Sequence, residues 1–240
     1  MDNEKIYNHF AKSVDDYDYV ADKVVMRNNE LHKVMVNALN FGSKSKLKIL
    51  DLGSGTGHGM FLMLKKFLNA KVTGIDFSHK MITNSREKLK GYNDRIKLIE
   101  DDFNKIDFDN DYDAIVSAIA IYNINHQEKA KLFQKIYGSL KDGGIFVNAD
   151  FIKGEESEIT EQYSKIYENY LRKNLSGGEL EVWLKHAFKE DMPMSLSGQF
   201  DLLTKASFLN IELVWQFNNL AVYVAQKIKS RGHEKRLVEL

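Results

Sequence analysis

Short apolar runs alternate with longer amphipathic segments over about two thirds of the chain. The runs have the length of buried strands, and the longer segments repeat apolar residues every three or four positions, as helices do. Strands are predicted at residues 48–52, 71–75, 95–100, 112–117 and 144–151, and helices at residues 59–68, 78–89 and 127–140. This alternation, with short connections, is typical of a parallel sheet in an α/β fold.

The last third of the chain follows a different pattern. Helices are predicted at residues 155–175, 179–188 and 196–207, and strands at residues 210–217 and 220–226. Asn218 and Asn219 separate the two strands and favour a hairpin turn. The segment Asp142-Gly143-Gly144 predicts a glycine stop after the third helix. The first forty residues are also amphipathic, which indicates helices ahead of the first strand.

Composition narrows the function classes. Lysine plus arginine and aspartate plus glutamate both number 34, so the formal net charge is zero and no nucleic-acid partner is expected. The absence of cysteine excludes disulfides and thiolate metal sites, and no metal is expected. The chain starts without an apolar leader, and no stretch reaches the ~20 apolar residues of a membrane span. A cytoplasmic protein without a membrane partner is therefore expected, while its oligomeric state is not predicted.

A glycine-rich loop follows the first predicted strand. Such a strand–loop–helix unit lets the backbone approach a ligand at the carboxyl edge of a sheet. The dinucleotide fingerprint needs a third glycine at the position of His58, whereas the glycines here are Gly53, Gly55 and Gly57, with an acid at Asp51. This spacing argues against a nicotinamide-dependent dehydrogenase.

The segment Asp51-Leu-Gly-Ser-Gly-Thr-Gly57 resembles the first motif of class I S-adenosylmethionine-dependent methyltransferases. The resemblance implies a Rossmann-like α/β fold with a seven-stranded, mostly parallel sheet of order 3-2-1-4-5-7-6 and helices on both faces. It also implies S-adenosyl-L-methionine as the cofactor. Asp51 would then lie near the methionine end of the cofactor, with Gly53, Ser54 and Gly55 along it.

An acid also ends the second predicted strand, about twenty residues after the loop. Asp76 is the expected ligand of the ribose hydroxyls, and Phe77 and Met81 are assigned to the same site. The alternative is an acid favoured by the dipole of the following helix. Ser78 is a candidate cap for that helix.

The segment after the third strand resembles the adenine-binding stretch of the family. Asp102 matches the acid that contacts the adenine amine, and Phe103 would lie beside the ring. Asp101 stands where the family usually has glycine, so the choice between Asp101 and Asp102 stays open. A solvated acidic loop is the alternative.

The segment after the fourth strand resembles a family stretch that often ends in two histidines. Ala118 would border the cofactor, while Tyr122 and Asn123 replace the histidines. The catalytic residue is therefore unknown, and Tyr122 and His126 are weak candidates. Asp150 and His186 are also expected near the pocket mouth.

The sequence also suggests positions for the side chains of Tyr17 and His58. Tyr17 belongs to a stretch that resembles the helical lid of several small-molecule methyltransferases, so it is a candidate cofactor contact. His58 is expected to face helix packing or solvent rather than the ligand.

These features predict one methyltransferase domain over residues 1–240. It comprises a helical N-terminal lid (1–45), a cofactor-binding core (46–151), a helical insertion or cap after the fifth strand (152–190), and a C-terminal helix with antiparallel strands (191–228). The expected function is in-line methyl transfer to a small molecule in a capped pocket. The alternatives are an RNA or protein methyltransferase and a non-catalytic S-adenosylmethionine-binding protein.

Overall fold

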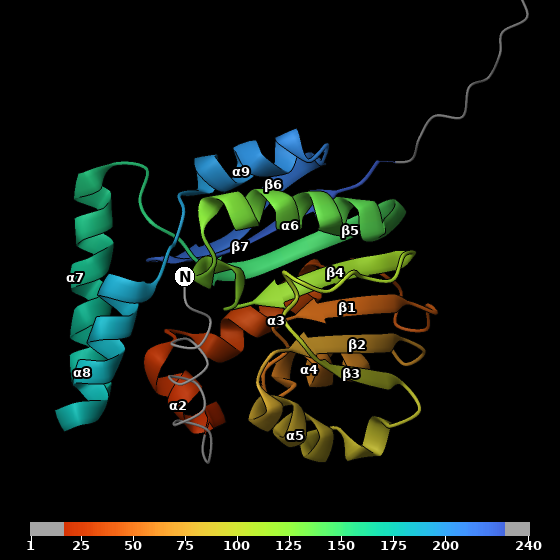
Figure 1. Cartoon of the computed structure of the whole chain (residues 1–240), viewed down its shortest axis with the longest axis horizontal. Helices are drawn as coiled ribbons and strands as arrows, with labels where there is room; N and C mark the ends of the chain where they lie inside the picture. Colours follow the sequence, from red (N-terminus) through yellow and green to blue (C-terminus); the bar gives the residue numbers. More distant parts are fainter. Residues whose placement is uncertain (1–16, 229–240) are drawn as a thin grey trace, which may run out of the picture.

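Seven strands form one mixed sheet in the computed structural model, which describes residues 17–228 and the side chains of residues 19–228 (Figure 1). The strands are β1 (Lys48–Leu52), β2 (Lys71–Asp76), β3 (Ile96–Glu100), β4 (Tyr112–Ala118), β5 (Leu140–Phe151), β6 (Leu209–Phe217) and β7 (Leu220–Gln226). Their order, β3-β2-β1-β4-β5-β7-β6, confirms the predicted order 3-2-1-4-5-7-6.

The pairing within the sheet is parallel from β3 to β5 and antiparallel at β7. Asp51 of β1 lies opposite Gly74 of β2 and Val116 of β4, so the carboxyl ends of these strands meet at one edge. β7 pairs antiparallel with both β5 and β6. Asn218 adopts a positive φ of 50° in the β6–β7 turn, which confirms the predicted hairpin.

Helices cover both faces of the sheet. They are α2 (Tyr17–Val24), α3 (Asn28–Ala38), α4 (His58–Lys66), α5 (His79–Lys88), α6 (His126–Ser139), α7 (Ser157–Asn174), α8 (Gly177–Lys185) and α9 (Leu196–Lys205). Shorter turns are η2 (Lys90–Tyr92), η3 (Ile121–Asn123) and the π-helical η4 (His186–Glu190). Leu31 of α3 and Met63 of α4 belong to the core of one face, and Phe133 of α6 and Leu203 of α9 to the core of the other.

Local side-chain chemistry fixes two of these helix starts. The Ser78 hydroxyl accepts a hydrogen bond from the Met81 amide at 3.4 Å, which confirms the predicted cap of α5. Asn125 and Glu128 form a reciprocal capping box at the start of α6.

The predicted glycine stop after α6 is wrong. The helix ends at Ser139, and β5 begins at once with the buried Leu140, which pairs with Tyr112. Gly143, at φ 83°, and Gly144 lie inside the strand, where the register with β4 shifts. Burial of Leu140 against β4 therefore extends the strand across the glycines.

The helices α2, α7 and α8 gather at the carboxyl end of the parallel strands. In Figure 1, α2 and the α7–α8 pair stand at this end of the sheet. The Tyr170 hydroxyl of α7 donates a hydrogen bond to the Asp22 carbonyl of α2 at 2.9 Å, which joins the two groups. Among the described helices, none has the length and apolar character needed to cross a membrane.

Candidate active site

A pocket of about 360 Å³ opens at the carboxyl ends of β1, β2, β3 and β4. Parallel α/β sheets bind ligands at this edge, where the connections diverge. The pocket is lined by all ten of the predicted cofactor-binding residues whose side chains are described: Asp51, Gly53, Ser54, Gly55, Asp76, Phe77, Met81, Asp102, Phe103 and Ala118.

The glycine loop brings backbone to the pocket wall. The amides of Gly53 and Ser54 both donate hydrogen bonds to the Ile75 carbonyl, at 2.9 and 3.0 Å, so the loop is tied to β2. Gly53 has a φ of 70°, and a Cβ there would lie 2.4 Å from the Ala120 Cβ. At Gly55 a Cβ would meet no atom within 4 Å, so this glycine faces open space. The loop therefore forms a cradle for a ligand.

Two acids lie deep in this pocket. Asp51 and Asp76 are 3% and 8% exposed. Burial, reinforced by the charge of Asp76, raises the pKa of Asp51 to about 8. Burial also raises the pKa of Asp76 to about 6, although hydrogen bonds from the Ser78 and Gly55 amides oppose this rise. Such a pair of carboxyls favours a cationic ligand.

Hydrogen bonds hold the Asp76 side chain in place. Its two oxygens accept from the Gly55 amide and the Ser78 amide, both at 2.9 Å. The carboxylate thus joins the glycine loop to the start of α5, with lone pairs left to accept from a ligand.

Of the two neighbouring acids after β3, Asp102 lines the pocket and Asp101 is exposed. The Asp101 carboxylate accepts a hydrogen bond from the Asp102 amide at 2.7 Å. The Asp102 carboxylate accepts one from the Asn104 amide at 2.9 Å. The structure therefore places the second acid, not the first, in the pocket lining.

The pocket also includes side chains that the sequence pattern did not single out. Asp22, Asn28, Asn29 and His32 reach it from α2 and α3, and Asn123 reaches it from η3. Asn28 and His32 are one helical turn apart and share a face of α3, a spacing by which the sequence could have indicated them.

His58 packs against a helix, as expected, and also lines the pocket. Its ring meets the ring of His32 edge-on, with centroids 4.8 Å apart. The approach of α3 across the glycine loop, which the sequence did not reveal, causes this arrangement.

The residues expected near the mouth lie elsewhere. Tyr122, Asp150 and His186 are 3%, 1% and 2% exposed, and none of them lines the pocket. His126 begins α6 and is exposed, also away from the pocket lining. Tyr17 begins α2, but its side chain lies outside the described part of the chain.

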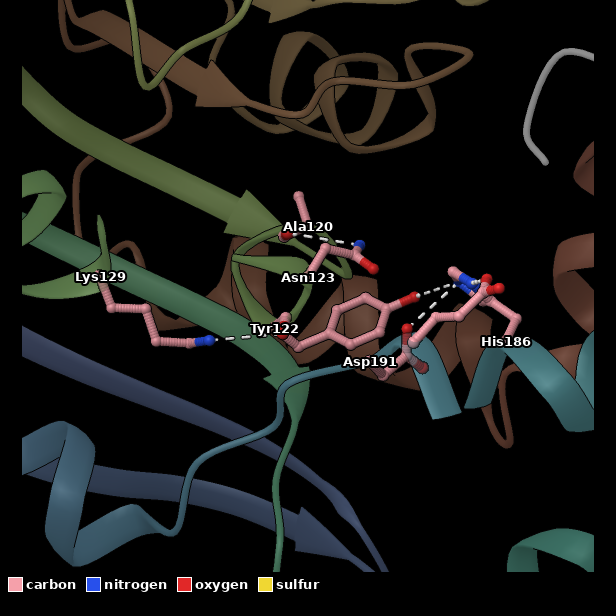
Figure 2. A network of polar contacts seen from close by, with 7 residues as sticks. Ala120, Tyr122, Asn123, Lys129, His186 and Asp191 are labelled. Atoms are coloured by element: carbon pink, nitrogen blue, oxygen red, sulfur yellow. Dashed lines mark hydrogen bonds and ion pairs between the residues drawn. The ribbon is translucent and has the colours of Figure 1, made fainter. Parts of the chain in front are cut away.

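Tyr122, Asp150 and His186 belong to a buried polar network beside the pocket. Figure 2 shows the contacts of Tyr122 and His186. The Tyr122 hydroxyl and Asp191 Oδ1 lie 3.5 and 3.3 Å from His186 Nε2. The Tyr122 amide donates to Asp150 Oδ2 at 2.8 Å. Burial lowers the pKa of His186, although Glu190 opposes this shift. The network therefore holds the end of the insertion against η3.

Acidic and imidazole side chains do not gather into a metal site in residues 17–228: no three histidines, aspartates or glutamates there could hold one ion.

Comparisons with known proteins agree with this geometry. A family model described as a methyltransferase domain matches residues 49–144. A curated relative from Nautilia profundicola, named carboxy-S-adenosyl-L-methionine synthase, is 32% identical over 75% of this chain and 77% of its own. A relative of the same name from Campylobacter concisus is 26% identical over 95% of this chain and 100% of its own.

Solved structures show the same fold. An O-methyltransferase family 2 protein from Planctomyces limnophilus, in complex with apigenin, matches with a TM-score of 0.65 and 17% identity. The match covers 89% of this chain and 62% of that chain, so this chain spans under two thirds of the solved protein. The chain belongs to the class I S-adenosylmethionine-dependent methyltransferases and is an enzyme of that type.

Proposed function

We propose that this enzyme transfers a methyl group from S-adenosyl-L-methionine to a small molecule in the pocket at the carboxyl edge of the sheet. One observation carries the proposal: ten predicted cofactor residues from four separate segments, at the ends of β1, β2, β3 and β4, line the same cavity. Residues 1–45 would act as a lid and residues 152–190 as a cap, within a single cytoplasmic domain.

The residues present fit this cofactor. The open side of Gly55 leaves room for a ligand against the backbone, and the buried acids suit a cation with neighbouring hydroxyls. Asp51 would hold the ammonium of the methionine end, Asp76 the ribose hydroxyls and Asp102 the adenine amine. Phe103 and Met81 would pack against the nucleoside. When bound, S-adenosyl-L-methionine supplies a methyl group already activated by its positively charged sulfur.

The chain's own contribution is then placement and exclusion of water. The pocket walls hold the acceptor in line with the methyl group, which lowers the entropic barrier of the transfer. A dedicated base is needed only for an acceptor that is protonated at the working pH. Tyr122 and His126 are given no catalytic role, since both lie away from the pocket lining.

Isothermal titration with S-adenosyl-L-methionine, S-adenosyl-L-homocysteine and NAD tests the cofactor assignment. Both sulfur nucleosides are expected to bind and NAD is not. A folded sample that binds neither nucleoside would refute the proposal. A screen of a metabolite library for release of S-adenosyl-L-homocysteine then identifies the acceptor.

A second candidate is formation of a carboxylated sulfonium cofactor. It is favoured by the name of the curated relatives, carboxy-S-adenosyl-L-methionine synthase. Mass spectrometry of the products separates the two candidates. Methyl transfer yields S-adenosyl-L-homocysteine, whereas carboxylation yields the sulfonium with one added carboxyl group.

Replacing Asp76 by alanine should weaken S-adenosyl-L-methionine binding by at least about 100-fold, since two charge-assisted bonds to the ribose are lost. Titration calorimetry measures the change. Glu100→Ala is the matched control, because this acid pairs in register with Asp76 but is exposed and outside the pocket lining. Unchanged affinity in the Asp76 variant would rule out the ribose assignment.

Cofactor binding should release close to one proton near pH 7. The pKa of Asp51 is about 8 without ligand, so this carboxyl is mostly protonated there. A bound ammonium favours the carboxylate, and the proton leaves to the buffer. Between about pH 6 and 7 the methionine ammonium stays charged, so affinity should rise with pH by up to about tenfold per unit. Titrations in buffers of different ionisation enthalpy count the protons, and zero release would contradict the Asp51 assignment.

A further inference from the structure

The pocket has a strongly one-sided charge. Asp22, Asp51, Asp76 and Asp102 line it, whereas no lysine or arginine is among the described residues that do so. Three of these acids belong to the cofactor assignment, and one positive sulfonium with its ammonium does not need the fourth. Asp22 therefore lies outside the set that the cofactor explains.

The rim of the pocket formed by α2, α3 and η3 carries one carboxylate and three side-chain amides. It presents the Asp22 carboxylate and the amides of Asn28, Asn29 and Asn123. The Asn28 amide nitrogen donates to Asp22 Oδ1 at 3.0 Å, which fixes this carboxylate at the rim. This orientation leaves Asp22 Oδ2 able to accept hydrogen bonds from a ligand.

Asn123 gives a second, independent observation. It is only 9% exposed and lines the pocket. Its amide nitrogen lies 3.5 Å from the Ala120 carbonyl, and its amide oxygen accepts no hydrogen bond from the described residues. Figure 2 shows this oxygen turned away from Ala120. This oxygen is therefore free to accept a hydrogen bond from a ligand in the pocket.

We propose that the rim of Asp22, Asn28, Asn29 and Asn123 binds the methyl acceptor, and that the acceptor is a small amine. An amine offers N–H donors to the Asn123 oxygen and to Asp22 Oδ2, the carboxylate oxygen that Asn28 does not bond. This inference rests on the proposed methyl transfer and adds the chemical class of its substrate.

The chemistry balances for such an acceptor. One N–C bond forms, the S–C bond of the donor breaks, and its electron pair stays on sulfur to give S-adenosyl-L-homocysteine. The proton that the amine loses passes to water. A carboxylate acceptor, or a carboxyl group on the cofactor, would instead face carboxylates without a described cation, and like charges at close range repel.

A fragment screen by ligand-observed NMR tests the proposal on the S-adenosyl-L-homocysteine-loaded protein. The library contains matched primary amines, alcohols and carboxylates on the same carbon skeletons, such as benzylamine, benzyl alcohol and benzoate. Amines are expected to be the most frequent hits by at least about threefold. Equal or greater binding of carboxylates, or no amine binding at all, would overturn the proposal.

Variants show whether the hits sit at the rim. Asp22→Asn and Asn123→Leu should each weaken amine binding by about threefold to tenfold and leave S-adenosyl-L-homocysteine affinity within twofold. Asp201→Asn on α9, an exposed acid outside the pocket lining, is the matched control. Amine binding that is unchanged in both rim variants would place the acceptor elsewhere. If the wild type did not bind S-adenosyl-L-homocysteine at all, that result would instead refute the proposed function itself.

Discussion

Replacing Asp51 by asparagine is expected to stabilise the unliganded protein by an amount that grows between about pH 4 and about pH 8, and to weaken S-adenosyl-L-methionine binding by at least about 30-fold. The two effects have one cause. The side chain is 3% exposed at the bottom of the pocket, where a charge is unfavourable until a cationic ligand arrives.

The sign of the stability effect follows from the raised pKa. Burial and the neighbouring Asp76 raise the pKa of Asp51 from 3.8 to about 8, so the native state keeps a proton that the unfolded state releases. The wild type therefore loses stability as the pH rises from about 4 to about 8. Each pKa unit corresponds to about 1.4 kcal/mol, so the accumulated loss is several kcal/mol. Asparagine has no such ionisation.

Urea unfolding at about pH 5 and about pH 9 measures the effect, since the stability gain is expected to be several times larger at the higher pH. Asp94→Asn is the control, because this acid is exposed and lies outside the pocket lining. Calorimetric titration supplies the affinity. An Asp51 variant that binds the nucleoside like the wild type, or that gains nothing at alkaline pH, would contradict this account of the site.

The sheet was predictable because its central strands combine two local signals. Residues such as Leu50 and Ile75 are apolar and buried in runs of strand length, and each run ends at an acid or a small polar residue. The glycine spacing then matched one family, whose strand order includes the antiparallel β7. Alternation alone would not have placed β7 between β5 and β6, because that pairing depends on contacts distant in sequence.

The cofactor half of the pocket was predictable for a related reason. Asp51, Asp76 and Asp102 each lie at the end of a predicted strand or shortly after it, and parallel strands bring their carboxyl ends to one edge. Their position along the chain therefore implied their proximity in space.

The acceptor half was not predictable in this way. Asp22 and His32 reach the pocket because α2 and α3 pack over the sheet edge, and no periodicity in the sequence states where a helix docks. Tyr122 is the opposite case. It lies in the η3 turn shortly after β4, yet its ring packs against Phe151, with centroids 5.0 Å apart, and the pocket receives its neighbour Asn123 instead. The short η3 turn redirects the side chains there, and a turn of three residues leaves little trace in the sequence.

A buried ammonium joins the pocket wall to the segment that follows the insertion. Lys129 is 1% exposed, and its Nζ donates to the carbonyls of Tyr122, Ile124 and Met192. Its charge also opposes the rise that burial causes in the pKa of Asp150. Ile124 lines the pocket, so Lys129 fixes part of the wall from behind.

Lys129→Met is therefore expected to lower the free energy of unfolding by about 3–5 kcal/mol, because it strands buried acceptors and a buried carboxyl without their cation. Lys131→Met, an exposed lysine on the same helix, should change it by less than about 0.5 kcal/mol. Urea unfolding compares the two. Adding Asp150→Asn should recover part of the loss, since it removes the uncompensated carboxyl. In the single variant, the KM for the acceptor should rise more than the Kd for S-adenosyl-L-homocysteine, because η3 loosens while the glycine loop keeps its bonds to β2. A loss below about 1 kcal/mol would show that the ammonium does not hold these segments together.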